Sequence, residues 1–153
     1  MRHGILRFAL LALVLSAAPV SAQAQTSMTG GISGRELCEQ AVCGAAIFVA
    51  GFAGQIDGRP TVGIAIGAIQ HTQLPQAPNE CATIVGGSWS ISTLRRTLAG
   101  EVPFGGTVCY VDGVKYLVNL TLKIDQGGSG QSHLSAVLDH GPFPPTIKGA
   151  ITQ

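Results

Sequence analysis

Residues 45–70 read AAIFVAGFAGQIDGRPTVGIAIGAIQ, and this stretch decides the fold class. Two apolar runs, residues 45–56 and 61–70, are separated by a short link that contains Asp57-Gly58. Asp-Gly between apolar runs is the strongest short-range indication of a β-hairpin, because its residues accept the positive φ angles of a tight turn. By composition the first run would also suit a buried helix. The turn favours two paired strands instead, and with them an all-β protein.

If the second run is a strand, its alternate side chains point to opposite faces. One face then carries larger side chains, which we call the large side, and the other carries smaller ones, the small side. The large side carries Val62, Ile64, Ile66 and Ala68. The small side carries Gly63, Ala65 and Gly67. Small residues let another element approach closely, or they leave room for a ligand. We therefore take these three, together with the single tryptophan, Trp89, as candidates for facing a ligand.

Residues 114–124 form the clearest single strand, because one set of alternate positions is wholly apolar and the other is mostly polar. Further strands are expected over residues 82–93, 97–102, 107–111, 132–140 and 146–152. Ile84 and Trp89 fall out of phase, and a β-bulge at Gly86-Gly87 would restore one common face. About eight strands, mostly joined by tight turns, predict a small antiparallel barrel, with a two-layer β-sandwich as the alternative.

One pattern occurs twice, as HTQLPQAPNECATI from His71 and as HGPFPPTIKG from His140. In each copy a His ends an apolar run, a Pro follows four residues later, and a Thr-Ile pair begins the next run. Each copy predicts the end of one strand, a Pro-stiffened loop and the start of the next strand. The barrel should therefore have two similar corners.

The first 24 residues have the form of a secretory signal peptide. Arg2 and Arg7 give a basic start, residues 8–14 are apolar, and cleavage patterns of small residues end at Ala22 and Ala24. The apolar run is too short for a membrane span, which takes about 20 residues. We therefore expect a periplasmic or secreted protein whose mature chain has no stable membrane span.

The mature chain is expected to be one domain. Residues 25–44 are interpreted as a flexible lead-in with a Cys-containing loop or short helix, and residues 45–153 as a single β domain. Ser33 and Glu36 have capping-box spacing, and Gly44 would close a short helix. That helix and a loop remain the two alternatives for this segment.

Charge excludes two classes of partner. Signal cleavage removes Arg2 and Arg7 and leaves seven Lys and Arg against eight Asp and Glu, a net charge of −1. Arg95-Arg96 is the only adjacent basic pair in the mature chain. Neither nucleic-acid binding nor attraction to an anionic lipid surface has its electrostatic pattern. The low charged fraction of 11% indicates a surface of small polar residues or one covered by a partner.

Four cysteines in an exported chain predict two disulfides. They are Cys38, Cys43, Cys81 and Cys109. A helix over residues 34–43 would direct the first two cysteines toward the later strands, whereas a loop would allow a local bond between them. We favour the local pairing, with the later two cysteines bonded to each other. No metal-binding knuckle is present, and neither a metal nor a cofactor is expected.

The candidate catalytic residues lie at the two repeated corners. His71 and His140 would face each other at one rim of the barrel if the corners are equivalent, and Asp139 and Glu80 are the neighbouring carboxylates. Such groups suit an acid–base pair or a divalent metal. The plainer interpretation is that each His holds loop backbone groups. No nucleophile elbow or phosphate-binding loop occurs.

Three functions follow in order of preference. The first is a binding module for a small apolar or amphipathic ligand, suggested by the small face of residues 63–67 and by the low charge. The second is a structural or interaction protein of the cell envelope. The third is a barrel enzyme, of the cyclase or isomerase type, that uses His71 and His140. Oligomeric state does not follow from these patterns.

Overall fold

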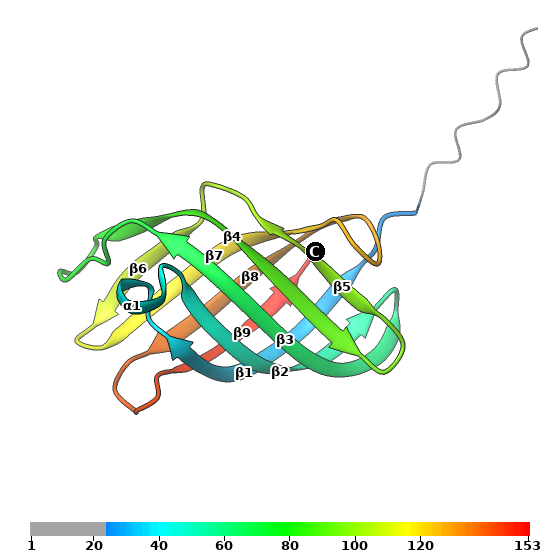
Figure 1. Ribbon diagram of the computed structural model, residues 1–153, viewed down its shortest axis with the longest axis horizontal. Coiled ribbons are helices and arrows are strands. Elements are labelled where there is room, and N and C mark those ends of the chain that lie inside the picture. The colour runs from blue at the N-terminus through cyan, green and yellow to red at the C-terminus, as the bar shows by residue number, and fades with distance from the viewer. Residues whose placement is uncertain (1–23) are drawn as a thin grey trace, which may run out of the picture.

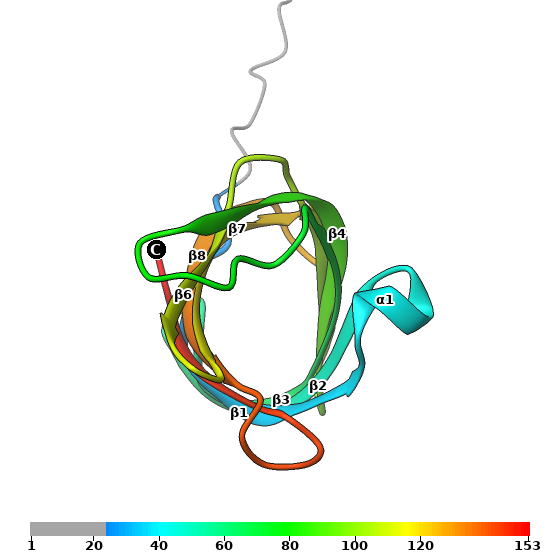
Figure 2. The ribbon, with the colours of Figure 1, turned by 90° about the vertical axis from the view of Figure 1, so that its left-hand side faces the viewer.

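The computed structural model describes residues 24–153, which form a closed antiparallel β-barrel with one additional strand and one short helix (Figures 1 and 2). The predicted signal peptide lies outside the described residues except for Ala24. The elements are β1 (Met28–Cys38), α1 (Gln40–Cys43), β2 (Ala46–Ile56), β3 (Arg59–His71), β4 (Cys81–Thr93), β5 (Thr97–Val102), β6 (Thr107–Asp112), β7 (Lys115–Ile124), β8 (Gly130–Asp139) and β9 (Thr146–Thr152).

The barrel consists of eight strands in the order β3-β2-β1-β9-β8-β7-β6-β4, and β4 pairs back with β3 to close the ring. All these pairs are antiparallel. Strand β5 shares one edge of β4 with β6, so that residues 81–83 of β4 pair with β6 and residues 87–92 pair with β5. The predicted barrel is confirmed, because a sheet that closes on itself is not a two-layer sandwich.

The hairpin at Asp57-Gly58 is confirmed. Strands β2 and β3 pair continuously from Ile56 opposite Arg59 to Ala46 opposite Ile69. Asp57 and Gly58 both have positive φ, of 52° and 71°, as this two-residue turn requires.

Strand β1 corrects the interpretation of residues 25–44 as a flexible lead-in. This strand pairs with β2 on one side and with β9 on the other, so it is an integral strand of the barrel. Its glycines follow from that position: a Cβ at Gly34 would lie 2.0 Å from the carbonyl oxygen of Val49 on β2. The capping-box interpretation also fails, because Ser33 and Glu36 lie within β1. Gly44 does end the helix, which is only four residues long, in a left-handed conformation.

The predicted irregularity in β4 is present. The β3–β4 register skips Val85, the residue directly before the predicted position at Gly86-Gly87, because Gln70 pairs with Gly86 and His71 pairs with Ile84. As a result Ile84 and Trp89 both point into the barrel and are 0% and 6% exposed. The bulge therefore turns two out-of-phase segments toward one core.

The two disulfides follow the local pairing. Cys38, the last residue of β1, bonds Cys43, the last residue of α1, and Cys81 on β4 bonds Cys109, its register partner on β6. The helical alternative required residues 34–43 to be one helix. Only Gln40–Cys43 is helical, so the chain can turn back between the first two cysteines.

Large and small side chains alternate across the barrel interior. Gly67 lies between Phe48 on β2 and Trp89 on β4, and these two aromatic residues are 8% and 6% exposed. The Trp89 indole donates a hydrogen bond from Nε1 to the carbonyl oxygen of Lys123, 3.0 Å away on β7. The small side of β3 thus faces inward, and its larger residues Val62, Ile64 and Ile66 face outward, with exposures of 68%, 58% and 51%.

Replacing Gly67 with alanine is expected to raise the free energy of unfolding by about 0.5–1 kcal/mol, because a Cβ at this site meets no atom within 4 Å and the unfolded chain loses freedom. Gly63→Ala, four residues earlier on the same face, is the matched control. Its Cβ would lie 2.5 Å from the Ser92 carbonyl oxygen, which predicts a loss of about 1–3 kcal/mol. Urea unfolding followed by Trp89 fluorescence measures both. Equal effects would contradict the packing shown here.

Candidate functional site

Both repeated corners lie at the same end of the barrel. Residues 72–80 join β3 to β4, residues 140–145 join β8 to β9, and the first of these loops crosses part of the opening (Figure 2). A pocket of about 320 Å³ lies here, which we call the mouth pocket. Its apolar lining includes Ala46, Phe48, Ile69, Val118 and Leu138, and Leu74 of the 72–80 loop lines it and packs against the core.

The polar centre of the mouth pocket is the contact between Glu36 and His140. Oε2 of Glu36 lies 3.1 Å from Nε2 of His140, and their side chains are 4% and 22% exposed. Strand β1 supplies the carboxylate, and its backbone is fixed by a hydrogen bond from Glu36 N to the carbonyl oxygen of Pro145. The imidazole comes from the residue directly after β8, whose N–H donates to the carbonyl oxygen of Val114.

The Glu36–His140 contact is an ion pair without an aligned hydrogen bond. Although the two atoms are close, neither Oε2 nor Nε2 makes a hydrogen bond of acceptable geometry to any group in residues 24–153, and both are buried. Buried polar atoms normally have such partners. The pair therefore presents an acceptor and a donor side by side at the wall of an otherwise largely apolar pocket.

The Glu36 carboxylate raises the pKa of His140 above its ordinary value through their direct contact, and this outweighs burial, which acts in the opposite direction. The negative charges of Glu39 and Asp139 act in the same sense as Glu36. The ring of Tyr116 lies against the imidazole, with the ring centroids 5.5 Å apart. Folding therefore favours the protonated form of His140 relative to the unfolded chain.

The unfolding free energy is expected to fall as the pH rises above about 6.5, the ordinary His value. Folded His140 holds its proton more tightly than unfolded His140, so its contribution is complete below that pH and is lost as the pH rises through the raised folded pKa. Glu36→Gln should flatten this slope, because it removes the largest cause of the shift. Urea titrations between pH 6 and 9 test this. His133→Asn is the control, and a wild-type slope in Glu36→Gln would contradict the assignment.

His71 lines the same pocket from the end of β3. Its Nδ1 lies 2.6 Å from the carbonyl oxygen of Thr72, which can only accept, so Nδ1 carries the proton in this bond. Gln40 of α1 fixes the backbone of His71 through two hydrogen bonds of 2.7 Å. The His71 backbone N–H donates to Oε1 of Gln40, and Nε2 of Gln40 donates to the His71 carbonyl oxygen. The loop closed by Cys38–Cys43 thus holds the end of β3 in place.

The structure brings some of the sequence candidates together and separates others. His71 and His140 both line the mouth pocket, whereas Asp139 and Glu80 do not. Oδ1 of Asp139 accepts a hydrogen bond from Gly141 N, and Glu80 is exposed in the 72–80 loop. The carboxylate in contact with an imidazole is Glu36, which sequence reasoning placed only in a helix cap.

None of the four ligand-facing candidates lines the mouth pocket. Ala65, Gly67 and Trp89 border a separate apolar cavity of about 60 Å³ inside the barrel, and Gly63 borders neither space. Pockets that hold organic ligands usually measure about 300–1,000 Å³. By volume, the mouth pocket is the better candidate.

Within residues 24–153, no three His, Cys, Asp or Glu side chains meet in an arrangement that could hold a metal ion. None of the helical structure described is long and apolar enough to cross a membrane. Comparison of the chain with protein-family models, curated protein sequences and solved structures found no match.

Proposed function

We propose that this protein binds a small amphipathic molecule in the mouth pocket, with the apolar body against Phe48, Ile69 and Leu138 and a hydroxyl group at the Glu36–His140 pair. The observation that carries the proposal is the buried carboxylate of Glu36, whose Oε2 lacks an aligned partner beside a pocket of about 320 Å³. A largely apolar wall with a few convergent polar groups is typical of ligand sites.

A hydroxyl group suits this pair better than a charged group. Its O–H can donate to Oε2 of Glu36 while its oxygen accepts from Nε2–H of His140. An anion would meet the Glu36 carboxylate, and a cation would meet protonated His140. The ligand is therefore expected to be neutral at its polar end.

The test uses 1-octanol and 1-methoxyheptane, which have the same composition but differ in the O–H donor. Isothermal titration calorimetry is expected to show tighter binding of 1-octanol to the wild-type protein. Glu36→Gln should weaken that binding about tenfold or more, since a hydrogen bond to a charged group contributes about 1.5–3 kcal/mol. His133→Asn, outside the mouth pocket, should have no effect. Equal binding of the two probes, unchanged in Glu36→Gln, would refute the hydroxyl site.

A second candidate is catalysis of proton transfer at the same pair. Glu36 raises the pKa of His140, which favours its acid form, and His71 lines the same pocket, so two imidazoles face one bound molecule. Exchange of the α-protons of cyclohexanone in D₂O, followed by NMR, tests this. Exchange no faster than in buffer, or equal in wild type and Glu36→Gln, would rule out acid–base catalysis by this pair on carbonyl compounds.

An envelope interaction role is favoured by the outer face of β3. Val62, Ile64 and Ile66 are more than half exposed in a row, whereas scattered single apolar residues are the usual case. Sedimentation at increasing protein concentration, comparing wild type with Ile64→Lys, tests this role. Concentration-dependent assembly that the lysine abolishes is the expected result, and a monomer at all concentrations would argue against self-association.

A further inference from the structure

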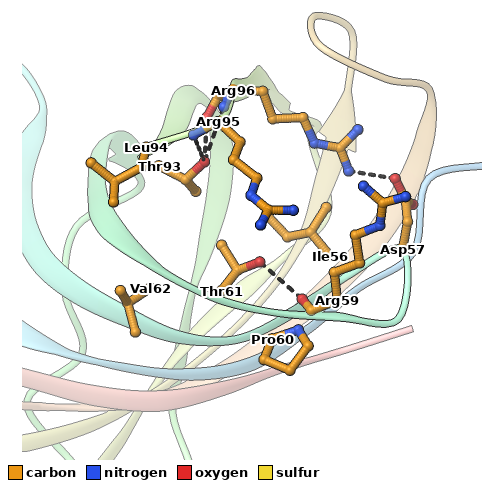
Figure 3. Close-up of a pocket in the computed structure, with 10 residues that line it drawn as sticks. All are labelled: Ile56, Asp57, Arg59, Pro60, Thr61, Val62, Thr93, Leu94, Arg95 and Arg96. Atoms are coloured by element: carbon orange, nitrogen blue, oxygen red, sulfur yellow. Dashed lines mark hydrogen bonds and ion pairs between the residues drawn. The ribbon is translucent and has the colours of Figure 1, made fainter.

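A second pocket, of about 460 Å³, lies at the end of the barrel opposite the mouth pocket. It is formed by the β2–β3 turn and the β4–β5 turn, and we call it the arginine pocket (Figure 3). Buried Ile56 contributes to its wall, and exposed Val62 and Leu94 extend it with apolar surface. Arg59, Arg95 and Arg96 are among its ten lining residues, with Asp57 as the single carboxylate.

The turn that carries two of these arginines is held by Thr93. Its Oγ1 accepts hydrogen bonds from the backbone N–H of Arg95 and of Arg96, at 3.2 and 3.1 Å. Its own backbone N–H donates to the carbonyl oxygen of Arg96 at 3.0 Å. The backbone positions from which both side chains leave the turn are therefore fixed.

Arg96 has a structural role. Its guanidinium forms an ion pair with Asp57 and also donates to the carbonyl oxygen of Gly127, so it joins the two turns (Figure 3). The same contact holds the pKa of Asp57 below its ordinary value. Asp57 additionally accepts a hydrogen bond from Ser27 N at 3.0 Å, so each of its two carboxylate oxygens has one partner.

Arg59 and Arg95 have no such partner. Neither guanidinium lies within ion-pair distance of a carboxylate in residues 24–153. Arg95 extends from the β4–β5 turn toward the middle of the arginine pocket, and Arg59 extends from the β2–β3 side (Figure 3). Three positive charges against one negative charge leave an excess of two at this site, although the mature chain is expected to be slightly acidic.

We propose that Arg59 and Arg95 bind the oxyanion, a phosphate or carboxylate group, of a small amphipathic molecule whose apolar part lies on Val62 and Leu94. A guanidinium matches such groups with two parallel N–H donors. The nearby apolar side chains give the ligand's hydrocarbon part a surface, which a free inorganic anion does not use. This site is independent of the mouth pocket and differs from it in selecting an anion.

Isothermal titration calorimetry with octyl phosphate, below its micelle concentration, tests the proposal. The Arg59→Gln/Arg95→Gln double variant should bind about tenfold or more weakly than wild type, because it loses charge-assisted hydrogen bonds. Arg35→Gln is the matched control, since Arg35 lies near the mouth and contacts the Pro144 carbonyl oxygen. The control should bind within twofold of wild type, and added salt should weaken wild-type binding.

Two further probes separate the parts of the proposal. Inorganic phosphate should bind at least tenfold more weakly than octyl phosphate, and equal affinity would overturn the amphipathic class of ligand. Glu36→Gln should leave octyl phosphate binding unchanged, so that the two pockets can fail separately. Octyl phosphate binding to the double variant within twofold of wild type would overturn the arginine pocket as an anion site.

Discussion

Replacing His140 with alanine is expected to lower the free energy of unfolding by about 3–5 kcal/mol at pH 7, the usual result of removing one partner from a buried ion pair. The reason is Glu36, which is 4% exposed and has only the imidazole beside Oε2. Without His140, the carboxylate must either remain charged in an apolar wall or take up a proton. Both alternatives cost free energy that the unfolded chain avoids.

The reverse substitution should cost less. In Glu36→Gln the remaining partner is His140, whose side chain is 22% exposed and whose ring can lose its proton near neutral pH. We expect a loss of about 1 kcal/mol, in the range of one neutral hydrogen-bonding group. The asymmetry between the two substitutions is the feature that identifies Glu36 as the buried charge.

A double variant provides the decisive comparison. Glu36→Met places an apolar side chain of similar length at the buried position, so Glu36→Met/His140→Ala should be more stable than His140→Ala alone. Glu101→Gln is the control, because Glu101 forms an exposed pair with Lys123, and solvent-exposed pairs contribute little to stability. Denaturant unfolding at pH 7 measures the set. A double variant no more stable than His140→Ala would show that the loss does not come from an unpaired carboxylate.

The expected rescue bears on why the pair is present. If two apolar side chains can replace Glu36 and His140 at little cost, folding does not require the ion pair. Its position in the wall of the mouth pocket then argues for a role in recognising a polar group of the ligand. Measuring the free energy of unfolding and 1-octanol binding on the same variants therefore tests the role of the pair in folding and its role in ligand recognition together.

Local patterns predicted much of the barrel because each depends on a short stretch of chain. Asp57-Gly58 specifies its turn through two positive φ angles, and the phase error between Ile84 and Trp89 specifies a bulge. The Cys38–Cys43 bond likewise needs only a chain that can turn between them. None of these features requires knowledge of a distant strand.

Strand β1 and the site residue on it were missed for a physical reason. Met28, Ile32 and Glu36 occupy the inner face of β1, but Gly30 and Gly34 interrupt that series where β2 approaches too closely for a Cβ. Without those side chains the apolar alternation that indicates a strand disappears. Glu36 therefore resembled a helix-capping residue rather than a carboxylate on the inner face of a strand.

The expected number of strands agreed with the barrel only because two errors offset each other. Strand β5 was counted in place of β1. In the structure β5 pairs with the same edge of β4 as β6 does, farther along that strand. Its bridge to the chain after β7 is only between Ala99 and Gln126. The sequence of a strand does not show which of its two edges is already paired with another strand. The same limit explains Gln40, whose partner is the backbone of His71 on a different element.

Removing the Cys81–Cys109 bond by a double serine substitution is expected to lower the free energy of unfolding by about 3.5 kcal/mol, because it releases a closed loop with a sequence separation of 28. This bond lies where the barrel is most weakly closed. Strands β4 and β6 pair through only three residue pairs, and Cys81 opposite Cys109 is one of them. Removing this disulfide therefore weakens the shortest strand pairing in the ring.

The Cys38–Cys43 bond provides the internal control, because its sequence separation is 5 and the same relation assigns it about 2 kcal/mol. Its removal should act instead on the mouth pocket, by releasing the helix that places Gln40 against His71. We expect urea unfolding of the two double serine variants to separate by about 1.5 kcal/mol, with the larger octanol-binding defect in the less destabilised one. Equal losses of stability would show that loop length does not govern these bonds, and the weak β4–β6 closure would then need another source of stability.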